Sequence, residues 1–296
     1  MKRLGVLGWP VAHSRSPAIH NAALVALGLS DWHYQRLPVP PELFEQTTRA
    51  LPGAGFVGAN VTIPHKQAAL ALADEASKTA MEVGAANTLT FDAGGGIAAE
   101  NTDAPGFIAA LPRPPAGMRA LVLGAGGSAR AVVWALREAG AREVCIWNRT
   151  PERARALAEA FEVSFVETTA PADLLVNCTS VGLSVGDPPN GAREAENVLE
   201  TRSGADTVER SATEDCALNQ QGLTFDQVGE YSYVADLVYR SGSTTPLLAA
   251  ADAHGAQTVD GLEILVAQGA LSFRLWTGRE PPLDVMRAAA RDEGRN

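Results

Sequence analysis

A glycine turn between a strand and a helix constrains the fold of this chain more than any other stretch. Residues 118–161, "MRALVLGAGGSARAVVWALREAGAREVCIWNRTPERARALAEAF", have the pattern of strand, turn, helix, strand and helix. Gly124, Gly126 and Ala129 match G-x-G-x-x-G/A, in which small residues allow a tight turn and close approach to a pyrophosphate. Small residues at such turns also serve packing alone. The strands on both sides favour a dinucleotide-binding unit over that alternative.

The end of the second strand of this unit indicates which nicotinamide cofactor it binds. An NAD site usually has an acidic residue about 20 positions after the glycine turn, to bind the ribose 2′-hydroxyl. This chain has Asn148-Arg149-Thr150 there. Arg149 could hold a 2′-phosphate through charged hydrogen bonds, which favours NADP. Alternatively, Arg149 is a solvated loop residue and Thr150 only caps the helix that begins at Pro151.

The rest of the chain alternates strand-like and helix-like segments, which predicts an α/β protein. Three such pairs open the sequence: 2–8 precedes a helix from Pro17, 32–39 precedes a helix over 41–51, and 56–63 precedes a helix opened by Pro64. A turn at 94–96 and a helix over 104–111 follow. The segment "PRPPAG" then has the composition of a linker, so the glycine turn belongs to a second unit.

Composition limits the possible partners and ligands. The chain has 296 residues, a formal net charge of −10 and a pI near 5.0, which argue against binding nucleic acid or an anionic membrane. No apolar run approaches the ~18 residues of a membrane span. The three cysteines are widely spaced and the five histidines lack ligand spacing, so neither a disulfide framework nor a metal site is expected. We therefore expect a cytoplasmic enzyme acting on a small molecule.

Short motifs along nearly the whole chain are together similar to those of the shikimate dehydrogenase family. In the family's order they are "GWPVAHSRSPAIHN", "NVTIPHK", "GAANTL", "NTDAPGF", "VLGAGGSARA", "NRT", "NCTSVGL", "DLVY", "TPLL" and "DGLEILVAQGALSFRLWTG". The resemblance implies NADP-dependent reversible reduction of 3-dehydroshikimate to shikimate in the shikimate pathway, which leads to chorismate and the aromatic amino acids. Shikimate or 3-dehydroshikimate is then the expected partner, the charge argues against nucleic-acid and membrane partners, and a homodimer stays open.

The same resemblance implies a domain division and the residues of the site. Residues 1–103, joined by C-terminal helices over 247–296, would form an α/β substrate-binding domain, and 104–246 a Rossmann-like NADP-binding domain. Lys66 and Asp103 would be catalytic. The implied substrate contacts are Ser14, Ser16, Thr62, Asn87, Asp103, Tyr239 and Gln268. The implied cofactor contacts are Gly124, Ala125, Gly126, Gly127, Ser128, Asn148, Arg149, Thr150, Arg153, Leu237 and Gly261.

Several of these side chains also have ordinary structural interpretations. Ser16 and Asp103 each precede a helix-like run and could be N-caps. Tyr239 could be a half-buried strand tyrosine, and Gln268 a solvated helix residue. Lys66 would lie in the first turn of its helix, where the macrodipole disfavours a cation by roughly 0.3–1 kcal/mol. In the family pattern that cost is offset by Asp103 and by a substrate oxygen, whereas a lysine extending to solvent is the usual alternative.

Two departures from the family pattern and two other functions stay open. "IAAENTD" lacks a glycine that the family often has before Asn-Thr-Asp. Residues 190–220 carry seven acids, three arginines and no aromatic residue, which predicts a mobile surface insertion. A quinate/shikimate dehydrogenase using NAD is the near alternative, which Asn148-Arg149-Thr150 argues against. A catalytically silent metabolite-binding regulator is the distant one, which Lys66 and Asp103 argue against.

Overall fold

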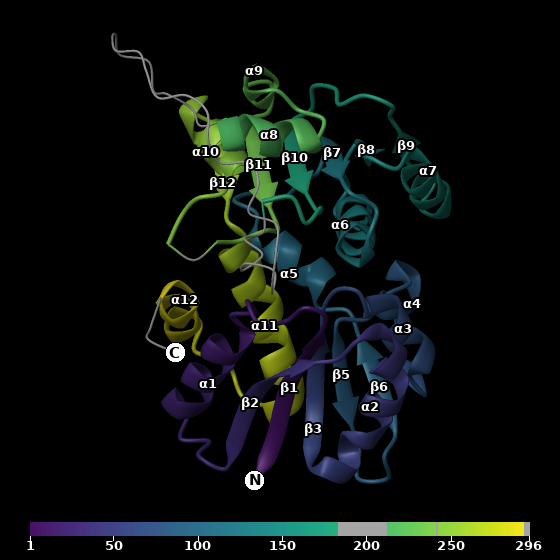
Figure 1. Cartoon of the computed structure of the whole chain (residues 1–296), viewed down its shortest axis with the longest axis vertical. Coiled ribbons are helices and arrows are strands. Elements are labelled where there is room, and N and C mark those ends of the chain that lie inside the picture. The colour runs from purple at the N-terminus through teal and green to yellow at the C-terminus, as the bar shows by residue number, and fades with distance from the viewer. Residues whose placement is uncertain (183–211, 241, 293–296) are drawn as a thin grey trace, which may run out of the picture.

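Two sheets, each flanked by helices, lie one above the other along the long axis of the molecule (Figure 1). The computed structural model describes residues 1–182, 212–240 and 242–292. Over these ranges each sheet has six strands, and the chain passes from the first sheet to the second and back again. This confirms the predicted α/β class with two units. No helix in the same ranges is long and apolar enough to cross a membrane.

The first sheet has the order β2-β1-β3-β5-β6-β4. Its strands are β1 (Lys2–Gly8), β2 (Trp32–Pro38), β3 (Phe56–Val61), β4 (Glu75–Ala76), β5 (Thr88–Phe91) and β6 (Ile97–Glu100). Its helices are α1 (Ser16–Ala26), α2 (Phe44–Ala50), α3 (Lys66–Leu72) and α4 (Lys78–Val83), with short 3-10 turns at Pro41–Leu43 and Pro52–Ala54. β1 pairs in parallel with β2 and β3, whereas β5 is antiparallel to β3. β5 is also antiparallel to β6, because a tight turn containing 94–96 joins them.

The prediction that Pro64 opens the third helix is wrong. α3 begins at Lys66, with His65 as its N-cap. The His65 amide donates to the Thr62 carbonyl at 2.9 Å, so the chain makes a turn around Pro64 before the helix starts. Lys66 nevertheless lies in the first turn, as expected, and it is the first helical residue.

The second sheet has the order β12-β11-β10-β7-β8-β9, and all its strand pairs are parallel. Its strands are β7 (Arg119–Leu123), β8 (Glu143–Trp147), β9 (Ser164–Phe165), β10 (Leu174–Asn177), β11 (Tyr233–Asp236) and β12 (Gln257–Val259). Its helices are α6 (Gly127–Glu138), α7 (Pro151–Ala160), α8 (Ala212–Gln220), α9 (Phe225–Val228) and α10 (Pro246–Ala253). Strand, glycine turn and helix follow each other as predicted for a Rossmann-like unit.

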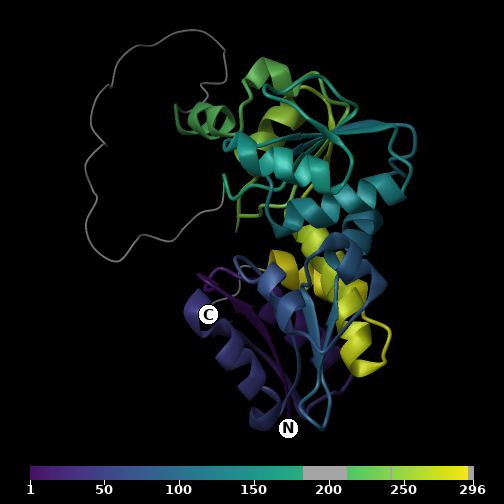
Figure 2. The same cartoon turned by 90° about the vertical axis from the view of Figure 1, so that its right-hand side faces the viewer.

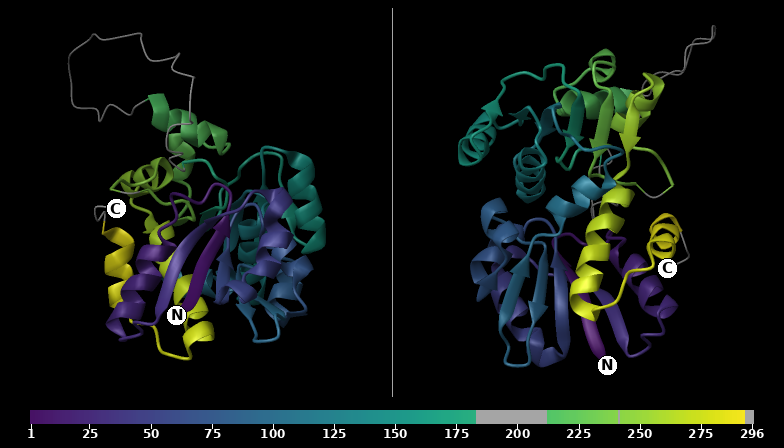
Figure 3. Two further views of the ribbon diagram at one scale, coloured as in Figure 1. Left: turned by 60° about the horizontal axis from the view of Figure 1, so that its bottom comes forward. Right: turned by 180° about the vertical axis from the view of Figure 1, so that it is seen from behind.

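Two helices connect the sheets, as seen from the side and from behind (Figures 2 and 3). α5 (Asp103–Ala110) leads out of the first sheet, and α11 (Gly261–Thr277) packs on α5 while returning to it. α12 (Leu283–Arg291) then packs on α1. The predicted return at 247 is wrong, because α10 and β12 belong to the second sheet. The returning segment begins at Gly261.

The prediction that residues 190–220 form a surface insertion is wrong for the C-terminal part of that range. Residues 183–211 lie outside the described part of the chain, and 212–220 form α8. Leu218 on α8 is 2% exposed and belongs to the same apolar cluster as Leu223 and Leu247. α8 also packs on α10. This end of the predicted insertion therefore contributes Leu218 to the core, and a deletion that includes Leu218 would remove buried contacts.

A buried imidazole lies between α1 and the first sheet. His20 is 1% exposed and stacks flat on Tyr34, with ring centroids 4.3 Å apart. Neither of its ring nitrogens has a hydrogen-bond partner among the described residues. Burial lowers the pKa of His20 to about 3, since the charged ring would lose its hydration there. The folded protein thus keeps this histidine neutral.

His20 predicts a loss of stability in mild acid. Below pH ~6.5 the unfolded chain protonates His20 and the folded chain does not, so stability falls as pH falls. Between pH 7 and pH 5 this costs about 2 kcal/mol of unfolding free energy. Urea unfolding at both pH values should show a loss larger by that amount in the wild type than in His20→Phe. Equal losses in both proteins would contradict the prediction.

The comparison of wild type with His20→Phe also separates the effect of His20 from that of Asp236, which changes stability in the opposite direction as pH falls. Burial raises the pKa of Asp236 to about 6, so this carboxyl favours the folded state as pH falls from about 6 toward its ordinary pKa. Asp236 is present in both proteins. Its contribution therefore cancels in the difference between wild type and His20→Phe.

Candidate active site

Two cavities lie side by side between the sheets and share residues at their junction. The larger has a volume of about 860 Å³ and the smaller about 180 Å³. Ile63, Lys66 and the segment 178–180 line both. Carboxyl ends of parallel strands in such folds are the usual place for ligands. Here the carboxyl ends of β3 and β10 bring Lys66 and Cys178 to the junction.

The glycine turn forms the floor of the larger cavity. Gly124 has a φ of +108°, and a Cβ there would lie 3.0 Å from the backbone carbon of Cys178. Only glycine fits this position. Gly126 faces open space and is the N-cap of α6, whose first amides are free to bind an anion. Ala129 is fully buried, as close packing of the helix requires.

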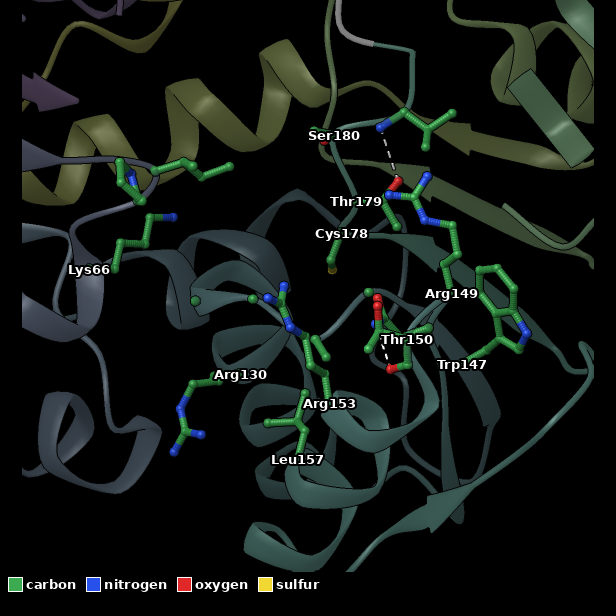
Figure 4. Close-up of a pocket in the computed structure, with 18 of the residues that line it drawn as sticks. Lys66, Arg130, Trp147, Arg149, Thr150, Arg153, Leu157, Cys178, Thr179 and Ser180 are labelled. Carbon is green, nitrogen blue, oxygen red and sulfur yellow. Dashed lines mark hydrogen bonds between the residues drawn. The ribbon is translucent and has the colours of Figure 1, made fainter. Parts of the chain in front are cut away.

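The far end of the larger cavity is basic. Asn148, Arg149 and Thr150 follow β8, and Arg153 lies in the first turn of α7 (Figure 4). In the described part of the chain, the lining residues include Lys66, Arg130, Arg149 and Arg153 but no acidic residue. Both Arg149 and Arg153 are exposed. A ligand with several negative charges fits these surroundings best.

Thr150 and Asn148 have more local roles at this end. Thr150 is the N-cap of α7, as the alternative interpretation proposed, although its side chain makes no capping bond. The Asn148 side-chain amide donates to the Thr150 carbonyl at 2.9 Å and shapes the turn from which Arg149 extends.

A lysine and a carboxylate meet in the smaller cavity. Lys66 Nζ lies 2.7 Å from Asp103 Oδ2 and 2.9 Å from Ser128 Oγ. Asn87 Nδ2 donates to the other oxygen of Asp103 at 2.8 Å. Lys66 is 9% exposed, so it is not a lysine extending to solvent. Asp103 is the first residue of α5, after the N-cap Thr102, so it is not the N-cap considered from the sequence.

Two serines and a tyrosine lie at the other end of the smaller cavity. The hydroxyl oxygens of Ser14 and Ser16 are 3.2 Å apart, and the Ser16 amide donates to Ser14 Oγ at 3.3 Å. Tyr239 Oη accepts from the Arg15 amide at 3.3 Å, and burial raises its pKa. The N-cap of α1 is Arg15 rather than Ser16, which leaves both serine hydroxyls at the cavity wall.

The remaining predicted residues divide between the two cavities. Thr62 and Gln268 line the smaller one, and Gln268 is 7% exposed rather than solvated. Ser128, Leu237 and Gly261, expected among the cofactor contacts, also line the smaller cavity rather than the larger one. The larger cavity contains the other expected cofactor contacts: Gly124, Ala125, Gly126, Gly127, Asn148, Arg149, Thr150 and Arg153.

A buried network of hydroxyls and amides supports this site and was missed from the sequence. Asn60 lines the smaller cavity, accepts from Tyr34 Oη at 2.8 Å and donates to Ser272 Oγ at 2.9 Å. Ser272 also contacts the hydroxyls of Thr88 and Thr102, at 2.9 and 3.2 Å. The spacing of these residues in the sequence could have indicated them. Asn60 lies two residues before Thr62, on the same face of the predicted strand, and Ser272 lies one helical turn after Gln268, on the same face of a helix.

The described part of the chain contains no group of three histidine, cysteine, aspartate or glutamate side chains suited to hold a metal ion. Cys178 is at the junction of the cavities, and burial raises the pKa of its thiol well above the ordinary value. It is therefore a neutral wall residue rather than a nucleophile.

Comparison with known proteins agrees with this geometry. The chain is 41% identical to the shikimate dehydrogenase (NADP(+)) of Methanopyrus kandleri over 97% of this chain and 93% of that protein. It is 40% identical to the protein of the same name from Paracoccus denitrificans, over 95% and 92%. The structure of shikimate 5-dehydrogenase from Thermus thermophilus, in complex with NADP(H) and shikimate, matches with a TM-score of 0.80 and 42% identity, covering 98% and 99%.

Three family models divide the chain much as its two sheets do. The shikimate dehydrogenase substrate binding domain matches residues 6–89, which hold most of the first sheet. The shikimate / quinate 5-dehydrogenase model matches 113–182, with the glycine turn and the basic end of the larger cavity. The shikimate 5'-dehydrogenase C-terminal domain matches 261–291, the returning helices. With relatives about 40% identical over almost its whole length, the chain belongs to the shikimate dehydrogenase family.

Proposed function

We propose that this protein catalyses the NADP-dependent, reversible reduction of 3-dehydroshikimate to shikimate. One observation carries the proposal: Lys66 lines both cavities, and its Nζ is hydrogen-bonded to Asp103 and to Ser128. A proton donor therefore lies where the two cavities meet. The names of the relatives and the Thermus thermophilus complex supply the substrate and the cofactor.

The larger cavity fits NADP on its own chemistry. The tight turn at Gly124 and the first amides of α6 suit a pyrophosphate. Arg149 and Arg153 suit a 2′-phosphate, and no acid stands at the end of β8 to bind a free 2′-hydroxyl. When bound, NADPH supplies the hydride and NADP+ accepts it.

The smaller cavity fits a hydroxylated ring with one carboxylate. Ser14, Ser16 and Tyr239 would hold the carboxylate at one end, because hydroxyls are its donors there. The implied contacts to the ring oxygens are Thr62, Asn87, Asp103 and Gln268. The side-chain amide of Asn87 donates to Thr102, Asp103 and Gln268, which fixes its orientation in the cavity wall.

Lys66 would act as the acid and the base of the reaction. In ketone reduction its ammonium gives a proton to the carbonyl oxygen, and in alcohol oxidation the amine takes the proton back. Asp103 and Ser128 accept two of the three ammonium hydrogens, which leaves the third for the substrate oxygen. The hydrogen bond from Asn87 to the other oxygen of Asp103 fixes the carboxylate during this proton transfer.

An absorbance assay at the nicotinamide band tests the proposal directly. The purified protein should reduce NADP with shikimate, and the rate with NAD should be lower by at least ~10-fold. Quinate is assayed in place of shikimate with both cofactors. Comparable or better rates with NAD and quinate would support the quinate/shikimate alternative. No turnover with any of the four pairs would favour the metabolite-binding regulator. We further propose a cytoplasmic location, which cell fractionation tests, and a homodimer, which size-exclusion chromatography with light scattering tests.

A further inference from the structure

Arg36 is a half-buried cation on β2 that holds the loop carrying Ser14 and Ser16. Its Nε and Nη2 both donate to the Ser14 carbonyl oxygen, at 3.1 and 2.9 Å. Two bonds from one planar guanidinium restrict both the position and the direction of this peptide. Since the Ser16 amide donates to Ser14 Oγ, the whole serine loop depends on the same anchor.

The strand register places Arg36 on the cavity side of the first sheet. In the parallel pairing of β1 and β2, Arg36 lies opposite Val6, so their side chains are on the same face. Val6 lines the smaller cavity. The positive charge of Arg36 also acts on two residues that line this cavity. Burial lowers the pKa of His13, and the charge of Arg36 lowers it further. Burial raises the pKa of Tyr239, and the charge of Arg36 opposes part of that rise.

No carboxylate in the described part of the chain forms an ion pair with Arg36. The neighbouring cation, Arg15, does have a negative partner. Its guanidinium donates to the carbonyls of Ala289 and Ala290 at the negative end of the α12 dipole. The acid in the smaller cavity, Asp103, is already paired with Lys66. Although the chain has a net charge of −10, the half-buried charge of Arg36 next to Ser14 and Ser16 has no ion-pair partner in the described part of the chain.

We propose that Arg36 is a positioning residue for the carboxylate end of the substrate. It fixes the Ser14 peptide, and its charge makes the serine end of the cavity select an anion. Arg36 is not itself a lining residue, so it acts through Ser14 and through its field rather than by contact. The inference rests on the proposed function and adds a specificity determinant to it.

Arg36→Gln tests the proposal, with Arg36→Lys and Arg3→Gln beside it. Arg36→Gln should raise the KM for shikimate roughly 10-fold, leave kcat within about 2-fold and leave the NADP KM unchanged. It should also flatten the fall of kcat/KM with salt at saturating NADP, because the steering charge is gone. Arg36→Lys should keep that salt dependence with a smaller rise in KM. Arg3→Gln is the control, because Arg3 on β1 also donates to a backbone carbonyl but is exposed.

Two results would overturn the proposal. One is an unchanged KM in Arg36→Gln. The other is an equal rise in KM for Arg36→Lys and Arg36→Gln with wild-type salt dependence, which would mean that Arg36 only supports the loop. Calorimetric titration of each protein with shikimate alone measures the same effect as a change in Kd. A wild type that binds shikimate but does not oxidise it would contradict the proposed function and would still decide the role of Arg36.

Discussion

Replacing Lys66 by alanine is expected to lower kcat for shikimate oxidation by at least ~100-fold, the usual contribution of a positioned acid or base. No second cation can replace the lysine, because the other side-chain partner of Asp103 among the described residues is the uncharged amide of Asn87. The KM for shikimate should change little, since the serines, Tyr239 and Gln268 remain. Steady-state kinetics with both substrates varied provides the measurement.

The matched control for this variant is Lys78→Ala. Lys78 also lies in the first turn of a helix and pairs with a carboxylate, but it is exposed and lines neither cavity. Its removal should leave kcat unchanged. Asp103→Asn should also impair turnover, and Lys66→Ala combined with Asp103→Asn should lose less than the sum, because the two act as a unit. Near-normal kcat in Lys66→Ala would remove the lysine from the mechanism, and strict additivity would assign the two residues independent roles.

Replacing Arg149 by alanine is expected to raise the KM for NADP by roughly 10- to 100-fold, because a guanidinium bonded to the 2′-phosphate contributes on the order of 1.5–3 kcal/mol. That contact is absent with NAD. The rate with NAD should hardly change. The discriminating measurement is kcat/KM for both cofactors at saturating shikimate. Arg155→Ala is the control, since Arg155 lies on the same helix as Arg153 but pairs with Glu167 outside the cavity.

Adding Asn148→Asp to Arg149→Ala extends the test. An acid at the end of β8 would bind the ribose 2′-hydroxyl of NAD and repel the phosphate of NADP. The double variant should move the preference toward NAD without changing the shikimate KM. Equal losses for NADP and NAD in Arg149→Ala would mean that Arg149 only supports its loop, and the physical argument for NADP would fail.

Local pattern predicted most of the elements around the site. The glycine turn, the strand before it and the helix after it all follow from residues 118–138 alone, because strand alternation and helix periodicity are local signals. The same holds for Lys66 in a first turn. Pro64 was misplaced since proline favours both the first helical position and the preceding turn, and only the Thr62 to His65 hydrogen bond distinguishes them.

Tertiary contacts account for what the pattern could not predict. Leu218 stands among polar residues, and only the packing of α8 on α10 makes it core. β12 has three residues, too few for a periodic signal, so the second sheet was ended too early. The network joins Ser272 to Thr88, 184 positions away in the chain, and a single serine on a helix does not indicate such a partner.

The return of α11 and α12 to the first sheet has a consequence for the order of synthesis. All residues of the second sheet are made before α11, so that unit has its complete set of strands while the chain is still growing. The first sheet lacks the helices that cover α5 and α1 until α11 and α12 leave the ribosome. Domains made first usually fold first. Here the part made first must wait longest, and a nascent chain halted before Gly261 would present an uncovered apolar face to chaperones and proteases.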